Sequence, residues 1–205
     1  MATLSGSRAF RLRGVIGVVL IAPVLLAILV SYPLIRPGSG WNLVMDIVGW
    51  GCYVTYVLFR IWAMLFLGGR KDSQLQTEGP YSITRNPLYV GSLFFALAVA
   101  FLFKSLLVAG MIVIIGIVYQ RGVITAEEKV LEGFFGDAFR EYCRRTPRFW
   151  PKLSLHHAPA TVTVNLKDFK VEMRRQLMAA FLPIAAQAIT YLRSQPGWPH
   201  WFMIP

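Results

Sequence analysis

Residues 84–103 read T-R-N-P-L-Y-V-G-S-L-F-F-A-L-A-V-A-F-L-F, so an arginine and an asparagine stand directly before a long apolar run. One interpretation is purely local. Asn86 caps a helix by accepting a hydrogen bond from a free backbone N–H, Pro87 suits the first helical turn, and Arg85 lies among lipid headgroups. The other interpretation makes these residues the rim of an active site. The rest of the chain is needed to choose between them.

The composition favours an integral membrane protein. The 205 residues are 56% hydrophobic and only 15% charged, fewer charges than a soluble domain of this size normally carries. Apolar segments approach the length of about 20 residues that a membrane span needs. They cover residues 14–35, 43–67, 87–103, 105–124 and 176–192. We therefore expect an all-α, polytopic membrane protein with four or five transmembrane helices.

Basic residues predict how the chain is oriented. If the first four segments each cross the membrane, the basic residues of 8–13, 70–85 and 121–152 fall on one side, and the opposite loops carry only Arg36 and Lys104. By the positive-inside rule the crowded side is cytoplasmic. The net charge of +11 lies beside apolar runs, which favours anionic lipid headgroups over nucleic acid as partners.

Residues 126–142 are predicted to form a cytoplasmic amphipathic helix. At about 100° per residue, Glu127 and Glu128 fall within about 60° of Leu131. The same face carries Phe134, Phe135, Ala138 and Tyr142. We expect this face to point inward with both carboxylates. The alternative is that the two acids occupy the first turn because the helix dipole favours negative charge there.

The chain is expected to divide near residue 153. Residues 1–153 would form the membrane core, and residues 154–205 a linker followed by a C-terminal helix. That helix, over 166–193, contains Pro183 and is either a kinked fifth span or a helix lying at the membrane interface.

Cysteine and histidine usage predicts no metal site. Cys52 lies in an apolar segment and Cys143 in a charged helix, so a disulfide between them is not expected. No C-x-x-C or Cys/His cluster occurs, and His156-His157 is a lone pair in a predicted loop.

The polar motifs follow a specific order. The stretch E-G-P-Y-S-I-T-R-N-P-L-Y-V-G precedes the apolar hairpin, and Arg121 and then E-E-K-V-L-E-G-F-F-G-D-A-F-R-E-Y-C-R-R-T-P-R-F-W-P follow it. Over residues 78–151 this resembles the isoprenylcysteine carboxyl methyltransferases and the related phospholipid N-methyltransferases. Those proteins show R-H-P-x-Y, a helical hairpin, E-E with F-G and a Tyr, and a V-P-R-like close. The resemblance implies an integral membrane enzyme that uses S-adenosylmethionine without a Rossmann domain. In agreement, the sequence contains no G-x-G-x-x-G motif after a predicted strand.

The resemblance also implies site residues. The cofactor would be held by Tyr81, Arg85, Asn86, Pro87 and Tyr89 on one side and by Glu127 and Glu128 on the other. Arg121 would lie near the acceptor and, with Arg85, is a candidate catalytic residue. Asn86 stands where the family has histidine, and asparagine can form hydrogen bonds but cannot titrate.

The chemistry leaves the acceptor open. A carboxylate acceptor is already ionised at pH 7 and needs an electropositive seat, which an arginine fork supplies, whereas an amine must first lose a proton. Carboxyl methylation of an isoprenylcysteine-like lipophilic substrate is the first prediction, at a cytoplasm-facing site in a bacterial-type cytoplasmic membrane. Phospholipid headgroup N-methylation is the second.

A non-enzymatic binding or transport protein is the remaining alternative. Transport paths usually need ionisable residues within the membrane. Asp46 and Arg60 are the ionisable residues inside apolar runs, and both are expected to snorkel to the interface. Three further arginines, Arg144, Arg145 and Arg148, are interpreted as headgroup anchors.

Overall fold

The computed structural model describes residues 26, 29, 35, 38–67 and 74–199, which contain helices and no strand. The helices are α2 (Gly40–Leu67), α3 (Pro80–Ile83), α4 (Pro87–Phe103), α5 (Leu106–Val118), α6 (Thr125–Arg145), α7 (Leu166–Ala179) and α8 (Phe181–Arg193). A π-helical turn, η2 (Tyr119–Ile124), joins α5 to α6, and a 3₁₀ turn, η3 (Leu153–Leu155), precedes α7. The all-α prediction is confirmed for this part of the chain. The predicted span over 14–35 and the basic residues 8–13 lie almost entirely outside it.

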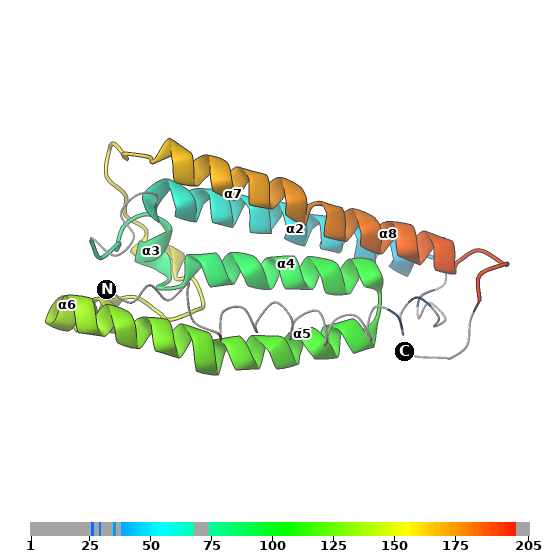
Figure 1. The fold of residues 1–205 in the computed structure, drawn as a ribbon, viewed down its shortest axis with the longest axis horizontal. Coiled ribbons are helices and arrows are strands. Elements are labelled where there is room, and N and C mark those ends of the chain that lie inside the picture. The colour runs from blue at the N-terminus through cyan, green and yellow to red at the C-terminus, as the bar shows by residue number, and fades with distance from the viewer. Residues whose placement is uncertain (1–25, 27–28, 30–34, 36–37, 68–73, 200–205) are drawn as a thin grey trace.

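Helix α4 occupies the middle of an elongated bundle (Figure 1). Helix α2 packs along α4, α7 lies against α2, and α8 lies against α4. After the predicted hairpin, α5 runs back beside α4, and α6 continues toward the end of the bundle that carries α3. Lys104 makes the hairpin turn in the left-handed region, with φ of 52°. The hairpin and the long α2 together bring the polar segments 74–86 and 125–152 to one end.

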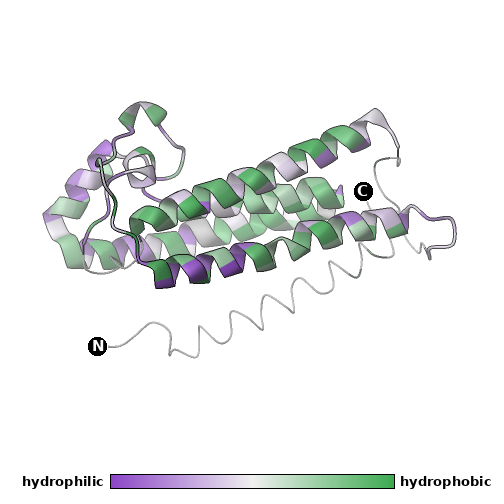
Figure 2. Ribbon diagram, turned by 90° about the horizontal axis from the view of Figure 1, so that it is seen from above, coloured by the Kyte–Doolittle hydropathy of each residue, from purple (hydrophilic) through white to green (hydrophobic). Residues whose placement is uncertain are grey.

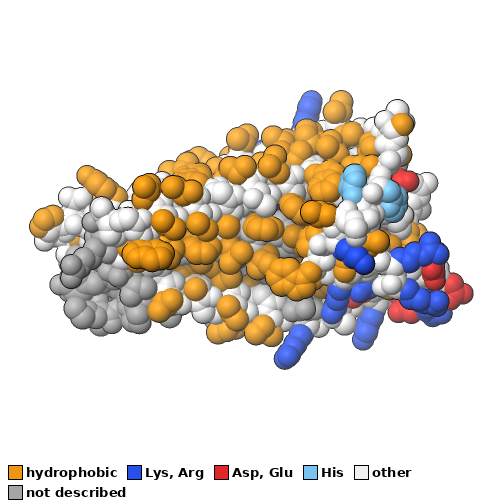
Figure 3. Space-filling model, turned by 180° about the vertical axis from the view of Figure 1, so that it is seen from behind, with side chains coloured by type: hydrophobic (Ala, Val, Ile, Leu, Met, Phe, Trp, Pro, Cys, Tyr) orange, Lys and Arg blue, Asp and Glu red, His pale blue; other side chains and the backbone are white. Residues whose placement is uncertain are grey.

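The surface of the bundle is apolar along most of its length. Helices Gly40–Leu67 and Val108–Arg145 are long and apolar enough to cross a membrane by length and composition, and Pro87–Phe103 is a shorter apolar helix. Large apolar side chains such as Leu58 on α2 and Ile114 on α5 are exposed. Figure 2 shows hydrophobic residues along much of the helical bundle. Figure 3 shows apolar side chains over the body of the bundle and most of the charged ones toward one end of that face. Because soluble proteins rarely expose apolar surface of this extent, the pattern indicates membrane association.

Close approach of α2 and α4 depends on small residues. A Cβ added to Gly91 would lie 2.9 Å from Cγ of Arg60, and one added to Gly49 would lie 2.7 Å from Cγ of Leu102. Small residues at such crossings allow helices to pack backbone against side chain. The α2–α4 pair is therefore the rigid part on which the polar end is built.

Asp46 and Arg60 are both ion-paired to other helices, and their reach to the membrane interface stays a prediction. Asp46 Oδ1 lies 2.7 Å from Lys104 Nζ at the hairpin, and Arg60 Nε lies 2.5 Å from Glu172 Oε1 on α7. The Glu172 side chain is 2% exposed. Each charge finds its counter-charge inside the bundle, which removes the need to reach water.

The C-terminal helix predicted over 166–193 is interrupted, so it consists of two helices, α7 and α8. It breaks at Ala180 between α7 and α8, and Pro183 lies in the first turn after the break, where it cannot donate a backbone hydrogen bond. Glu172 and Gln176 of α7 are buried, and Ala186 of α8 is part of a core cluster with Leu102. Both halves are thus packed against the bundle.

Helix α6 contains a kink that the sequence-based helical wheel does not allow for. Gly136 has φ of 52° and ψ of −123°, which ends regular helical geometry in the middle of α6. Before the kink Glu128 is partly buried and Phe134 is 63% exposed, and beyond it Tyr142 is buried. The prediction of one continuous inward face over 126–142 is therefore wrong for Glu127, Phe134 and Ala138, which are exposed, and right for the partly buried Glu128 and the buried Tyr142. The kink at Gly136 sets the second half of α6 at a different rotation from the first, which a single wheel does not allow for.

Candidate active site

The T-R-N-P motif is tied to a segment more than 60 residues away. The Arg85 amide donates to the Pro147 carbonyl at 2.9 Å, and the Lys152 amide donates to the Ile83 carbonyl at 2.9 Å. Between these two bonds the buried Thr84 hydroxyl donates to the Phe149 carbonyl at 3.0 Å. Residues 83–85 and 147–152 are therefore held side by side by three hydrogen bonds at the polar end of the bundle, and we call this pair of segments the clip.

The turn that precedes this clip in the chain requires a glycine, Gly79. Gly79 has φ of +60°, and an added Cβ would lie 2.5 Å from Cζ of Phe66 on α2. The turn leads directly into α3, where the Tyr142 hydroxyl donates to the Tyr81 carbonyl at 2.7 Å. Gly79 thus lets the chain turn against α2, and Tyr142 ties the second half of α6 to the same turn.

Asn86 occupies the N-cap position of α4, but its side chain does not cap the helix. The Tyr89 and Val90 amides instead donate to the Asn86 backbone carbonyl, each at 3.0 Å. The Asn86 Nδ2 donates to the Arg148 carbonyl at 2.9 Å and to Glu128 Oε1 at 3.4 Å. The predicted side-chain cap is therefore wrong, because the amide group faces the neighbouring segments, whereas Pro87 is the first residue of α4 as expected.

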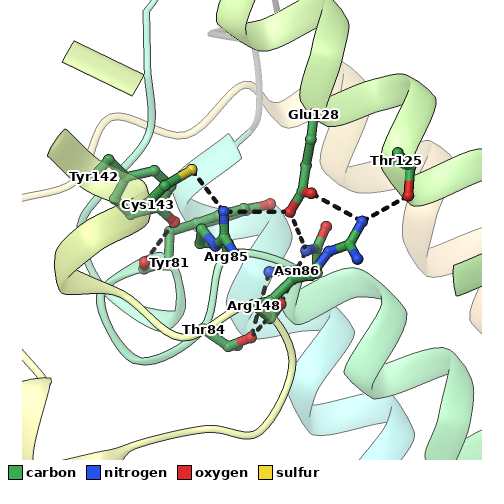
Figure 4. A network of polar contacts seen from close by, with 9 residues as sticks. All are labelled: Tyr81, Thr84, Arg85, Asn86, Thr125, Glu128, Tyr142, Cys143 and Arg148. Atoms are coloured by element: carbon green, nitrogen blue, oxygen red, sulfur yellow. Dashed lines mark hydrogen bonds and ion pairs between the residues drawn. The ribbon is translucent and has the colours of Figure 1, made fainter. Parts of the chain in front are cut away.

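Glu128 is the centre of the polar network in Figure 4. Its Oε2 lies 2.9 Å from Arg148 Nη2, and its Oε1 lies 3.5 Å from Arg85 Nη1. The Arg148 Nη2 also donates to the Thr125 hydroxyl at 2.8 Å. The Glu128 side chain is 18% exposed, so its two charged partners are only partly screened by water. One carboxylate thereby joins α6, the start of α4 and the segment after α6.

Glu127 has a different environment from its neighbour. Its Oε2 accepts a hydrogen bond from the Tyr89 hydroxyl at 2.9 Å, and this contact is exposed. Adjacent helical residues point about 100° apart, which explains why the two carboxylates diverge. The bond between Glu127 and Tyr89 links α6 to α4 beside the contacts that Glu128 makes.

Two of the predicted site residues lie apart from this network. Tyr81 is 8% exposed and packs with Ala63 and Phe66, and burial raises the pKa of its phenol, which therefore stays protonated. Arg121 is exposed in the π-helical turn and has no hydrogen bond or ion pair within the described residues. Such π-helical turns occur often at functional sites.

Sequence reasoning missed Arg148 and Cys143. Arg148 was expected to be a headgroup anchor, yet it contacts Glu128, whereas Arg144 and Arg145 pair with Glu141 on the exposed face of α6. The Cys143 thiol accepts a hydrogen bond from Arg85 Nη1. Two signals for Arg148 were present: its position after Thr146-Pro147, where the helix ends, and the likeness of T-P-R to the V-P-R-like close of the family.

The network is suited to a polar ligand that carries both charges. The Nε atoms of Arg85 and Arg148 are buried and have no hydrogen-bond partner among the described residues. The network thus holds two arginine donors that the described residues do not use, while the adjacent Glu127 carboxylate is exposed. No group of His, Cys, Asp and Glu side chains that could hold a metal occurs in the described part of the chain.

Comparison with known proteins identifies the family. A model of the phospholipid methyltransferase family matches residues 44–138. The nickel-cobalt-cadmium resistance protein NccN of Alcaligenes xylosoxydans xylosoxydans is 30% identical over 146 residues, which cover 71% of this chain and 68% of NccN. The protein-S-isoprenylcysteine O-methyltransferase of Schizosaccharomyces pombe is 32% identical over 77 residues, 38% of this chain and 33% of that protein. The chain belongs to the isoprenylcysteine and phospholipid methyltransferase family.

The chain aligns with a different share of each relative's length. The cobalt-zinc-cadmium resistance protein CzcN of Cupriavidus metallidurans is 39% identical over 111 residues, and the aligned part spans 51% of its length. No solved structure matches the chain. The family match includes Arg85, Asn86 and both glutamates, but it ends before Arg148 and before α7.

Proposed function

We propose that the protein is an S-adenosylmethionine-dependent methyltransferase that crosses the membrane several times and methylates a lipophilic acceptor. The observation that carries the proposal is the convergence of Arg85, Asn86 and Arg148 on Glu128 at the polar end of an apolar bundle. Family membership supplies the reaction class. The active site would face the cytoplasm, where the basic residues gather.

The cofactor, when bound, supplies an electrophilic methyl group on a sulfonium, together with a carboxylate, an α-ammonium group and ribose hydroxyls that the protein must hold. The residues present fit these groups. The exposed Glu127 carboxylate is suited to accept from the ammonium or the ribose hydroxyls, and Tyr89 holds that carboxylate in place. Arg85 has a buried Nε that no described residue uses as a donor. Catalysis would come mainly from alignment and from the exclusion of water.

Carboxyl methylation of an isoprenylcysteine-like substrate is the function that the geometry supports best. Arg121 is exposed, has no partner within the described residues, and lies at the end of the apolar helix α5. A lipid chain along α5 would therefore place its polar end next to a free guanidinium, which suits a carboxylate that is already ionised. Phospholipid headgroup N-methylation is the second candidate, since the exposed Glu127 could accept the proton that an amine must lose.

We infer four or five spans for the whole chain. Helices α2, α4 and α5 would cross, and the predicted segment 14–35 would add another. The kinked α7–α8 pair would be the fifth, because α7 contacts α2 and α8 contacts α4 inside the bundle. A helix lying on the membrane surface would not bury Glu172 against Arg60. This pairing also argues against a free intramembrane charge of the kind that transport paths use.

Binding of S-adenosylhomocysteine to the detergent-purified full chain tests the proposal. Isothermal titration should show binding to the wild type and a loss of at least about tenfold in Glu128→Ala and Arg85→Ala, since each removes a charge-assisted contact. Glu132→Ala is the matched control, because Glu132 pairs only with the exposed Arg140. The proposal is wrong if the wild type does not bind. Transfer of a labelled methyl group into N-acetyl-S-farnesylcysteine or into phosphatidylethanolamine vesicles then separates the two acceptors.

A further inference from the structure

Arg148 lies outside the family match, yet it has the most direct contact with Glu128. Building on the proposed function, we propose that Arg148 is a ligand-binding residue that seats a carboxylate, and that Asn86 is the positioning residue that holds it there. The carboxylate is that of the amino-acid end of the cofactor or that of the acceptor. Three observations carry this assignment.

The first observation is that the backbone of Arg148 is held rigidly. Asn86 Nδ2 donates to its carbonyl at 2.9 Å, the preceding Pro147 carbonyl accepts from the Arg85 amide, and the following Phe149 carbonyl accepts from Thr84. Three consecutive carbonyls are thus bonded to three consecutive residues of the 84–86 motif. A side chain presented from such a segment has little freedom to move away from the site.

The second observation is that the guanidinium of Arg148 is only partly used. Its Nη2 serves both Glu128 and Thr125, and the described residues offer no hydrogen bond to its other two nitrogens. The side chain is 34% exposed, compared with 75% and 76% for Arg144 and Arg145, so it is neither a free surface group nor a buried one. The terminal Nη1 therefore remains available to donate a charge-assisted hydrogen bond to an anionic ligand, whereas Nε is buried.

The third observation is the charge balance. Arg85 and Arg148 share the single carboxylate of Glu128, which leaves one positive charge uncompensated within the network. The Cys143 thiol, the Asn86 amide and the Thr125 hydroxyl are the other side chains that contact these three residues, and the amide and the hydroxyl are neutral. The neighbouring Glu127 is hydrogen-bonded to Tyr89 and forms no ion pair with either arginine within the described residues. An anionic group placed against Arg148 would balance the remaining positive charge, and on the cofactor and on an isoprenylcysteine-like acceptor that group is a carboxylate.

Asn86 fits the role of a positioning residue. Both of its contacts are made through Nδ2, to the Arg148 carbonyl and to Glu128, and it carries no titratable proton. It therefore acts through the geometry of Arg148 and not through acid–base chemistry. Asparagine in place of histidine here is consistent with a reaction that needs no proton transfer at this position.

The test compares ligands that differ only in the carboxylate, with Arg148→Gln and Arg148→Lys in the full-length detergent-purified protein. The cofactor arm titrates S-adenosylhomocysteine against 5′-S-(3-aminopropyl)-5′-thioadenosine, which lacks the carboxylate. The acceptor arm titrates N-acetyl-S-farnesylcysteine against its carboxamide. Arg145→Gln is the matched control, because Arg145 pairs only with Glu141. Thermal unfolding of every variant reports whether it is folded.

The wild type is expected to prefer the carboxylate form in one arm by about 10- to 100-fold, the range for a charge-assisted hydrogen-bonded pair. Arg148→Gln should abolish that preference, Arg148→Lys should retain part of it, and Arg145→Gln should leave it intact. Asn86→Ala should reduce the preference without changing the pH dependence of binding.

If Arg148→Gln loses the preference in the cofactor titration, the carboxylate belongs to the cofactor; if it loses the preference in the acceptor titration, the carboxylate belongs to the acceptor. If Arg148→Gln folds and keeps the full preference in both arms, Arg148 is not the seat. A wild type that binds neither S-adenosylhomocysteine nor farnesylcysteine overturns the proposed function itself, which is a different result.

Discussion

Replacing Glu128 by glutamine, with Glu127→Gln as the matched control, separates the roles of two adjacent carboxylates. Glu128 contacts residues from three segments, whereas Glu127 accepts one exposed hydrogen bond from Tyr89. We expect Glu128→Gln to loosen the clip between residues 83–85 and 147–152. Glu127→Gln should leave the clip closed and weaken only ligand binding.

The magnitude follows from the burial of the ion pairs. Exposed pairs contribute about 0–1 kcal/mol, and breaking a fully buried pair costs about 3–5 kcal/mol. The Glu128 side chain is 18% exposed and its partners Arg85 and Arg148 are 16% and 34% exposed, which places these pairs between the two limits. A glutamine keeps one oxygen as an acceptor but turns an amide toward a guanidinium. We expect a loss of about 2 kcal/mol in the local stability of the clip.

Hydrogen exchange at two amides measures this effect directly. The Arg85 and Lys152 amides close the clip at its two ends by donating to Pro147 and Ile83. A loss of about 2 kcal/mol raises the exchange rate of both amides by about 30-fold when they exchange through local opening. The reasoning is refuted if Glu128→Gln leaves both amides protected, or if Glu127→Gln exposes them equally.

Two further substitutions test the support of the site. Arg60→Met alone should destabilise the protein by about 3 kcal/mol, because the buried Glu172 loses its closest counter-charge and keeps only the more distant, exposed Arg175 and the Gln176 amide. The double variant with Glu172→Leu should recover most of this loss in SDS-unfolding titrations, and equal stability of the single and double variants would contradict the reasoning. Gly79→Ala should lower the free energy of unfolding by about 1–3 kcal/mol, because of the positive φ at this position and the contact of the added methyl group with Phe66. Gly110→Ala is the control: its methyl group meets open space on α5, so it should be neutral or stabilising in the same assay. A neutral Gly79→Ala would show that the turn does not require glycine.

Local signals in the sequence were sufficient for the elements and for the position of the motifs. The apolar runs after residue 40, the tight turn at Lys104 and Pro87 at the first position of α4 all depend on residues close together in the chain, and the structure bears them out. The order of the R-N-P and E-E motifs also indicated the family. It placed Glu128 opposite Arg85 and Asn86, although these residues are more than 40 positions apart.

Only the tertiary structure decided which charges pair. Arg148 stands in the sequence as one more arginine after Arg144 and Arg145, and its contact with Glu128 depends on the turn that follows α6. Arg60 likewise finds Glu172 across 112 residues. Partner choice of this kind depends on which helix faces meet, and composition does not encode it.

The sequence by itself determined an all-helical, apolar chain of the methyltransferase family with its polar motifs at one end. The tertiary structure decided that Asn86 does not cap α4, that Gly136 interrupts α6, and that Glu128 and not Glu127 holds the site together. The physical reason is the range of the interactions. Helix formation and membrane partition act over neighbouring residues, whereas a buried carboxylate is satisfied by whichever donors the packing of distant segments brings to it.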